Sequence, residues 1–288
     1  MRILVIGAGG AQGGAVARRL AAEGHAVRGL SRTGSAPEGV EPFAADLGDA
    51  ARVAEAFAGV THVSVTLPLV FEAGPVEAYV RNVLEAASGA GVRRLVLNTG
   101  NRLPGRATGV AAFDTRRAAA AAALASGVPT VVLSPPLYLE NLAAPGVLEA
   151  GVLRHPVPGD VPVSWLSHAD LAAATSAALL GDGPEGATVA PGSPPVTGVE
   201  LAAAVGARYE ELDVAAFEAG LSAVLGAGAA AGVADTYRWI AAHGRDLYTA
   251  GTGDAGAADE EAGDAGVGGA IRVTPPREWL AAQPWAAR

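Results

Sequence analysis

Glycines gather where a short apolar run gives way to a predicted helix. Ile3–Ile6 is a predicted strand, and Gly7-Ala8-Gly9-Gly10-Ala11-Gln12-Gly13 follows it directly. Glycines at this place allow a tight turn and let backbone N–H groups and a helix N-terminus approach a pyrophosphate. A plain turn between a strand and a helix is the alternative. We interpret the segment as a dinucleotide-binding loop with contacts from Gly7, Gly9, Gly10, Ala11, Gln12 and Gly13.

The end of the second predicted strand bears on which dinucleotide binds. An NAD site carries Asp or Glu about twenty residues past the glycines, where it binds the adenine ribose. Ser31-Arg32-Thr33 stands at that place here. A guanidinium pairs with phosphate in a fork geometry, so we predict that Ser31 and Arg32 bind the 2′-phosphate of NADP(H). A solvated surface arginine is the alternative for Arg32.

Polar residues also end the later predicted strands, where ligands bind in open parallel sheets. Asp46 either accepts a hydrogen bond from the adenine amino group or caps the helix after it. Thr99 either offers a hydroxyl to a substrate or only shapes a turn. The cofactor contacts expected from these strand ends are Asp46 and Leu47, then Thr66, Leu67 and Pro68, and finally Asn98 and Thr99.

Missing residue types exclude several chemistries. All twenty cationic side chains are arginine and there is no cysteine. A Schiff base, a thiolate nucleophile and a Tyr-x-x-x-Lys proton relay are therefore excluded. A net charge of -9 gives no basic surface for nucleic acid, and the five histidines lack metal-ligand spacing. We expect a cytoplasmic protein that binds no metal, nucleic acid or membrane.

Short apolar runs alternate with longer helical segments through the first half of the chain. This alternation predicts an α/β fold with a doubly wound parallel sheet of the Rossmann type. The strands are expected at 3–6, 26–30, 43–45, 63–65, 95–97 and 130–133, and the helices at 13–23, 49–58, 76–88 and 113–125.

After residue 133 this alternation ends. Prolines interrupt 137–163, which predicts loops and short elements, and His155 is expected on a surface loop there. Ser167 is a predicted N-cap, and small helices are expected over 198–247. Residues 251–269 are rich in Gly, Ala and acidic residues, which predicts a mobile loop. We predict a Rossmann core at 1–134 and a smaller irregular and helical region at 135–288 on the substrate side, both in one compact unit.

Two further motifs are Phe113-Asp114-Thr115-Arg116 and Tyr138-Leu139-Glu140-Asn141. Together with the glycine loop, Arg32, Asp46, Thr66 and Thr99-Gly100, they resemble the NmrA-like group of atypical short-chain dehydrogenases/reductases, above all its redox-sensor branch. The resemblance implies that the glycine loop holds a pyrophosphate and Arg32 a 2′-phosphate. It also implies that Arg116, Tyr138 and Asn141 lie near the nicotinamide.

The chain departs from this family at one position, because the family enzymes carry lysine where Arg116 stands. Arginine has a pKa above ~12 and cannot exchange protons, although it can hold a ribose hydroxyl or a carbonyl. Thr99, Arg116 and Tyr138 are the catalytic candidates. For Tyr138, an aromatic wall that stacks on the nicotinamide is favoured over a proton donor to a bound carbonyl. We expect an NADPH-dependent oxidoreductase that transfers hydride to a quinone or conjugated carbonyl, with protons from solvent. The alternatives are an NADPH/NADP redox sensor that acts through a regulatory protein, and a redox-neutral enzyme; a homodimer is left open.

Overall fold

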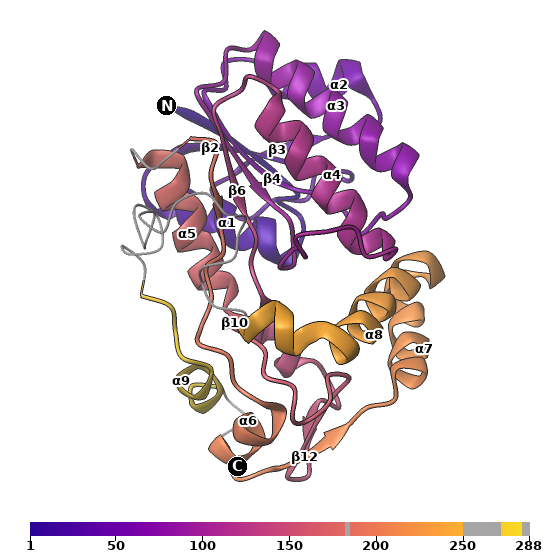
Figure 1. Ribbon diagram of the computed structural model, residues 1–288. Coiled ribbons are helices and arrows are strands. Elements are labelled where there is room, and N and C mark those ends of the chain that lie inside the picture. Colours follow the sequence, from indigo (N-terminus) through magenta and orange to yellow (C-terminus); the bar gives the residue numbers. More distant parts are fainter. Residues whose placement is uncertain (182–184, 250–271, 284–288) are drawn as a thin grey trace, which may run out of the picture.

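The computed structural model describes residues 1–181, 185–249 and 272–283 (Figure 1). The segment predicted to be a mobile loop, 251–269, lies outside these residues. A parallel sheet of seven strands forms the centre, in the order β11-β6-β5-β4-β1-β2-β3. Its strands are β1 (Arg2–Ile6), β2 (Ala26–Ser31), β3 (Glu41–Ala44), β4 (His62–Thr66), β5 (Arg94–Asn98), β6 (Thr130–Leu133) and β11 (Thr188–Val189). The predicted doubly wound sheet is confirmed.

Helices cover both faces of the sheet and bury its apolar side chains. One face packs against α1 (Ala11–Ala22) and α5 (His168–Leu180). The other packs against α2 (Ala50–Ala56), α3 (Ala73–Gly89) and α4 (Ala111–Ala125). Because both faces are covered, β1 and β5 contain continuous apolar runs rather than alternating ones.

Three helices begin two or three residues earlier than their apolar periodicity predicts, α4 at Ala111 among them. α1 begins at Ala11 rather than Gly13, because Gly10 is its extended N-cap residue and Gly13 and Gly14 are helical. α3 begins at Ala73 rather than 76. Pro75 lies in the first turn of α3, where its missing N–H costs no intrahelical hydrogen bond.

Part of the second half of the chain returns to the central sheet. Strand β11 pairs with β6, and α5 packs beside α1. The boundary expected after residue 134 therefore does not coincide with the edge of the sheet. The predicted cap of α5 is confirmed, since the Ser167 hydroxyl oxygen accepts a hydrogen bond of 3.0 Å from the Asp170 N–H.

A smaller lobe lies below the carboxyl edge of the sheet in Figure 1. It contains β7 (Leu137–Tyr138) paired with β10 (Trp165–Leu166), a sheet in the order β12-β9-β8, and several helices. Its remaining elements are η1 (Leu139–Ala143), β8 (Leu148–Glu149), β9 (Val152–His155), α6 (Gly198–Ala204), β12 (Arg208–Glu211), α7 (Val214–Leu225), α8 (Ala227–Thr249) and α9 (Pro276–Ala281).

The expectation of only small helices over 198–247 is wrong in two respects. β12 is a strand because it pairs in parallel with β9, a long-range contact that sequence periodicity does not report. α8 has 23 residues, since its alanine-rich sequence contains no proline that would end it. In Figure 1, α8 lies on the side of the small lobe that faces the Rossmann layers. Among the described residues, every helix is too short or too polar to span a bilayer.

Candidate functional site

The glycine loop lies in the crevice between β1 and β4, where the strand order reverses. Gly7 has a φ of +85°, and a Cβ built on it would lie 2.8 Å from the Thr66 carbonyl oxygen. A Cβ on Gly13 would lie 2.5 Å from the Gly7 carbonyl carbon, so α1 meets the loop backbone directly. No side chain caps the start of α1 at Gly10. Its first N–H groups are therefore available to an anion.

Arg32 lies directly after β2, beside this loop. Its side chain is exposed. The neighbouring Ser31 hydroxyl donates a hydrogen bond of 2.7 Å to the Ser35 carbonyl oxygen. A Cβ on Gly9 would lie 3.1 Å from both the Ser31 Cβ and the Ser35 carbonyl oxygen, which shows that the glycine loop packs against this turn. A phosphate near the loop therefore lies within reach of Arg32.

Asp46 follows β3 on the same side of the sheet and is exposed. Its Oδ1 accepts a hydrogen bond of 2.7 Å from the Gly48 N–H, which forms a local turn. The N-cap of α2 is Asp49, whose Oδ1 accepts from the Arg52 N–H at 3.0 Å. The alternative that Asp46 caps this helix is therefore wrong. Leu47 is buried, and its carbonyl oxygen accepts from the Asn82 side chain.

A hydrogen-bonded network joins the glycine loop to the end of β5 and to the small lobe. The Asn98 Nδ2 donates to Gln12 Oε1 at 2.9 Å, and the Tyr138 hydroxyl donates to Asn98 Oδ1 at 3.4 Å. Burial raises the pKa of Tyr138 well above its ordinary value. The phenol therefore stays protonated at neutral pH and acts as a donor. The Tyr138 ring packs against His168, with centroids 4.9 Å apart.

Thr99 has a hydroxyl that is already engaged. The residue is buried, and its Oγ1 lies 2.7 Å from the Asn101 carbonyl oxygen and 3.1 Å from that of Leu133. These contacts favour the structural alternative, in which the side chain fixes the turn after β5.

Arg116 is a buried cation at the carboxyl end of β4. Only 6% of the residue is exposed. Its Nη2 donates to the Pro68 carbonyl oxygen at 2.5 Å, and the guanidinium lies 5.3 Å from the centre of the Phe71 ring. Its Nη1 is enclosed and has no hydrogen-bond partner in the described chain. Burial lowers the pKa of Arg116 to about 10, so the group remains charged at neutral pH.

This arrangement leaves a charged donor without an acceptor at the edge where ligands bind in such sheets. Burying a charge is costly unless a partner compensates it. Arg116 can therefore hold an electronegative group, such as a ribose hydroxyl or a carbonyl oxygen, beside Pro68.

Asn141 and its neighbours lie in the small lobe, near the Tyr138 end of the network. Asn141 is exposed and hydrogen bonds to Tyr237, whose pKa is raised by burial to about 12. Glu140 Oε1 accepts a hydrogen bond of 2.9 Å from the His168 N–H. No sequence pattern connects Glu140 with His168, because only the folded chain brings η1 to the start of α5.

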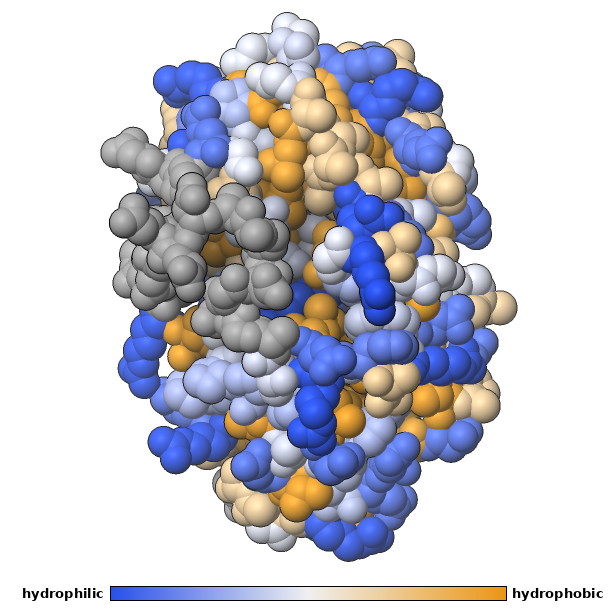
Figure 2. Space-filling model, viewed as in Figure 1, coloured by the Kyte–Doolittle hydropathy of each residue, from blue (hydrophilic) through white to orange (hydrophobic). Residues whose placement is uncertain are grey.

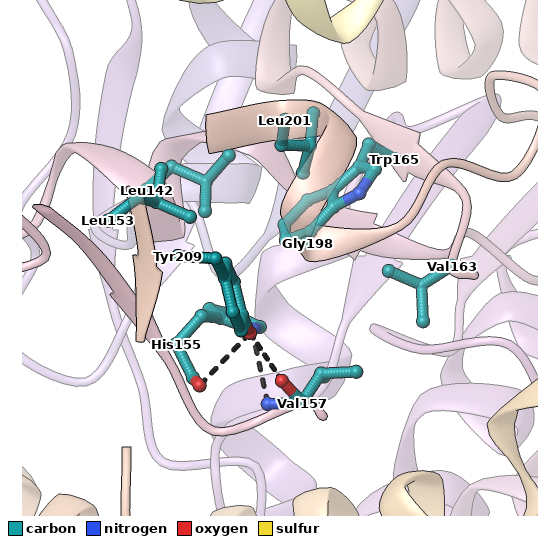
Figure 3. Close-up of a pocket in the computed structure, with 9 residues that line it drawn as sticks. All are labelled: Leu142, Leu153, His155, Val157, Val163, Trp165, Gly198, Leu201 and Tyr209. Carbon is teal, nitrogen blue, oxygen red and sulfur yellow. Dashed lines mark hydrogen bonds between the residues drawn. The ribbon is translucent and has the colours of Figure 1, made fainter. Parts of the chain in front are cut away.

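A closed cavity inside the small lobe is unsuited to a substrate (Figure 3). Its volume is about 10 Å³, the space of a single water molecule. His155 lines it and is buried, so its expected place on a surface loop is wrong. Strand β9 carries His155 inward, where its ring packs against Trp165 and Tyr237. Tyr209 donates to the carbonyl oxygens of His155 and Val157, which makes this cavity part of the packing.

An apolar groove of about 300 Å³ runs along the outside of α3 and α4. Figure 2 shows hydrophobic residues over these two helices. The lining of the groove includes Val76, Val80, Leu84, Ala118, Ala119 and Ala122 with a few polar and charged neighbours. None of the residues predicted to contact the cofactor lines this groove.

The fold and the glycine loop together define a dinucleotide-binding protein of the Rossmann class. The chain belongs to the NmrA-like family, whose model matches residues 1–211. This membership confirms the resemblance seen in the sequence motifs.

A curated relative comes from Streptomyces griseus subsp. griseus and is called (4-alkanoyl-5-oxo-2,5-dihydrofuran-3-yl)methyl phosphate reductase. It is 36% identical over 239 residues, which cover 77% of this chain and 80% of the relative.

Two solved structures share the fold over nearly the whole chain. The NADPH-dependent quinone oxidoreductase of Escherichia coli, complexed with NADPH, has a TM-score of 0.72 and 24% identity, with 98% of this chain and 99% of that chain covered. The triphenylmethane reductase of Citrobacter sp., complexed with NADP(H), has a TM-score of 0.74 and 20% identity, with 96% and 98% covered. These likenesses establish the Rossmann fold and its added lobe.

Proposed function

We propose that this protein is an NADPH-dependent reductase that acts on a small molecule with a carbon–carbon double bond conjugated to carbonyl groups, or on a quinone. The observation that carries the proposal is the buried Nη1 of Arg116, which has no hydrogen-bond partner among the described residues. It lies at the same sheet edge as the Gln12–Asn98–Tyr138 network. The name of the 36% identical relative supports it, because the substrate in that name is an acyl-substituted unsaturated lactone.

The residues present fit NADP(H). Gly7 and Gly13 leave no room for a side chain in the loop that would hold the pyrophosphate. Arg32 is exposed beside that loop, at the place for a 2′-phosphate. Arg116 and Tyr138 would lie near the nicotinamide, with the Asn141 segment behind them. When bound, NADPH supplies a hydride.

The absence of lysine restricts the class of compound that can accept the hydride. A simple ketone needs a proton donor of tuned pKa as its carbonyl is reduced. Burial raises the pKa of Tyr138, which makes its phenol a weaker acid, and Arg116 does not release its proton at neutral pH. A double bond conjugated to carbonyl groups needs no such proton donor. After hydride transfer the carbonyl oxygens share the negative charge until water supplies a proton. A quinone has the same property.

The first experiment measures NADPH, NADH and NADP binding by calorimetry and then turnover in the same buffer. The acceptors are a synthetic hexanoyl butenolide phosphate (an acyl-substituted unsaturated lactone phosphate) and a panel of quinones. We expect tight NADPH binding and turnover above the protein-free rate. Gly10→Asp should abolish both, because it places a carboxylate where the pyrophosphate binds. If no acceptor is reduced by the wild type, the proposed activity is wrong.

Tight NADPH binding without turnover would instead favour the redox-sensor alternative. A sensor needs NADPH and NADP to differ in their effect on a regulatory protein or on self-association. Sedimentation of the free, NADPH-loaded and NADP-loaded protein measures that difference and also tests for a homodimer.

A further inference from the structure

Arg102 is a second arginine at the carboxyl edge, and no carboxylate of the described residues forms an ion pair with it. It lies four residues past the end of β5 and is half-buried. Its guanidinium lies 5.5 Å from the centre of the Tyr248 ring, and its Nη2 donates to the Ala190 carbonyl oxygen at 3.4 Å. Its Nε is enclosed and has no hydrogen-bond partner among the described residues. Neither contact, a phenol ring or a carbonyl oxygen, provides a formal negative charge.

A buried arginine elsewhere in the chain shows how such a charge is usually compensated. Arg28 on β2 is 7% exposed, and its Nη2 forms an ion pair of 2.9 Å with Glu41. Its Nη1 donates to the Ala56 carbonyl oxygen at 2.7 Å. Arg102 has no comparable carboxylate in the described chain, and desolvation lowers its pKa. A bound anion would supply the missing charge.

The position of Arg102 separates it from the dinucleotide loop. Ala190 follows β11, and the neighbouring Leu103 N–H donates to the Ser134 hydroxyl, just after β6, at 3.0 Å. Arg102 therefore lies on the β6–β11 side of β5. The glycine loop occupies the β1–β4 crevice, and Arg116 reaches Pro68 after β4. An anion at Arg102 is therefore on the substrate side and is not a phosphate of the dinucleotide.

The loop that carries Arg102 is held in place from two directions. The Tyr248 hydroxyl donates to Asn101 Oδ1 at 3.2 Å, and Asn101 Oδ1 also accepts from the Arg102 N–H at 2.8 Å. The Tyr248 ring on α8 lies against the guanidinium itself. A planar guanidinium whose neighbours are fixed loses little freedom when it donates to two oxygens of an anion.

We infer that Arg102 binds the anionic group of the substrate, and that this group is a phosphate ester, as in the substrate that the 36% identical relative is named for. The inference rests on the proposed function and adds to it the part of the acceptor that the chain recognises. The hydride-accepting double bond would lie toward Arg116 and the Tyr138 network, and the phosphate would extend toward Arg102 and Tyr248.

The test compares Arg102→Gln with Arg106→Gln, which removes the same charge from an exposed position on the same loop. The probes are the hexanoyl butenolide phosphate and its dephosphorylated alcohol. We expect Arg102→Gln to raise KM for the phosphate ester by roughly tenfold to a hundredfold, the range for a lost charge-assisted hydrogen bond. In Arg102→Gln, the kcat/KM for the alcohol and the Kd for NADPH should change less than twofold. In Arg106→Gln, the KM for the phosphate ester, the kcat/KM for the alcohol and the Kd for NADPH should all change less than twofold.

Binding is measured separately, so that the inference does not depend on turnover. Calorimetry of the NADP-loaded protein gives the Kd of the phosphate ester for the wild type and for both variants, and thermal melting confirms folding. If the wild type binds the ester through Arg102 but reduces nothing, the proposed activity fails and the phosphate site stands. Equal losses for ester and alcohol, an unchanged Kd for the ester, or weaker NADPH binding in Arg102→Gln would each overturn the phosphate site.

Discussion

Replacing Gly13 with alanine tests the dinucleotide loop more directly than any other substitution in the chain. The new methyl would lie 2.5 Å from the Gly7 carbonyl carbon and closer still to its oxygen. Carbon atoms in contact prefer about 3.5 Å or more, so the start of α1 or the loop must move by about 1 Å. Overpacking of this kind costs about 1–3 kcal/mol, against a gain of up to about 1 kcal/mol in helix propensity.

The larger effect of Gly13→Ala falls on NADPH binding. A shift of the loop moves the N–H groups that would donate to the pyrophosphate. Each hydrogen bond to a charged group contributes about 1.5–3 kcal/mol, and tenfold in Kd corresponds to about 1.4 kcal/mol. We therefore expect the Kd for NADPH to rise by roughly tenfold to a hundredfold for each bond lost, which calorimetry measures directly.

Gly10→Ala is the matched control for this substitution. A Cβ on Gly10 would lie 3.4 Å from the Gly7 carbonyl oxygen, which is an ordinary contact, and its φ of -93° suits alanine. We expect this variant to bind NADPH nearly as the wild type does. Equal Kd values for Gly13→Ala and Gly10→Ala would refute the assignment of this loop as a close-fitting cradle.

Three further predictions concern the 2′-phosphate, a helix cap and a buried histidine. Arg32→Glu should weaken NADPH binding at least about tenfold and leave NADH binding nearly unchanged, because only NADPH carries the 2′-phosphate; equal losses in calorimetry would contradict the assignment. Asp49→Ala should lower the free energy of unfolding in urea by about 1 kcal/mol without changing NADPH affinity, since it removes only the α2 cap. His155 has its pKa lowered by burial to about 3, so the unfolded state binds an extra proton between pH 6.5 and 3. As the pH is lowered through that window, the free energy of unfolding should fall by up to about 1.4 kcal/mol per pH unit. His155→Gln should show a smaller dependence of this free energy on pH. If the wild type and His155→Gln show the same dependence on pH, His155 binds its proton as readily in the folded state as in the unfolded state, and the prediction is wrong.

The parts of the fold that are set by local sequence could be predicted. The glycine loop follows a strand and opens a helix, and its role depends on backbone geometry that glycine spacing reveals. Strands β1, β5 and β6 contain apolar runs whose pattern can be read. Strand β11 has only two residues, and β12 (Arg-Tyr-Glu-Glu) has no apolar run, so both depend on the neighbouring strand that they pair with.

The parts of the site that depend on distant segments could not be predicted. Tyr248 reaches Asn101 across 147 positions of the chain, and no spacing rule connects them. Arg102 stands near the end of a predicted strand, where ligand-binding residues are common, but only burial beneath α8 distinguishes it from the exposed Arg106. The prolines around His155 predicted a loop, and the tertiary packing of β9 places the ring inside.

Helix α8 fixes the distance between two contacts at opposite ends of the site. Near its start, Gly232 packs so closely against the Phe71 ring that a Cβ there would overlap it, and sixteen residues later Tyr248 covers Arg102. At a rise of 1.5 Å per residue these two points are about 24 Å apart. Inserting or deleting one turn would displace one end by about 5.4 Å and break the contact there. Relatives that keep both contacts are therefore expected to vary in their loops while the number of turns in this helix stays fixed.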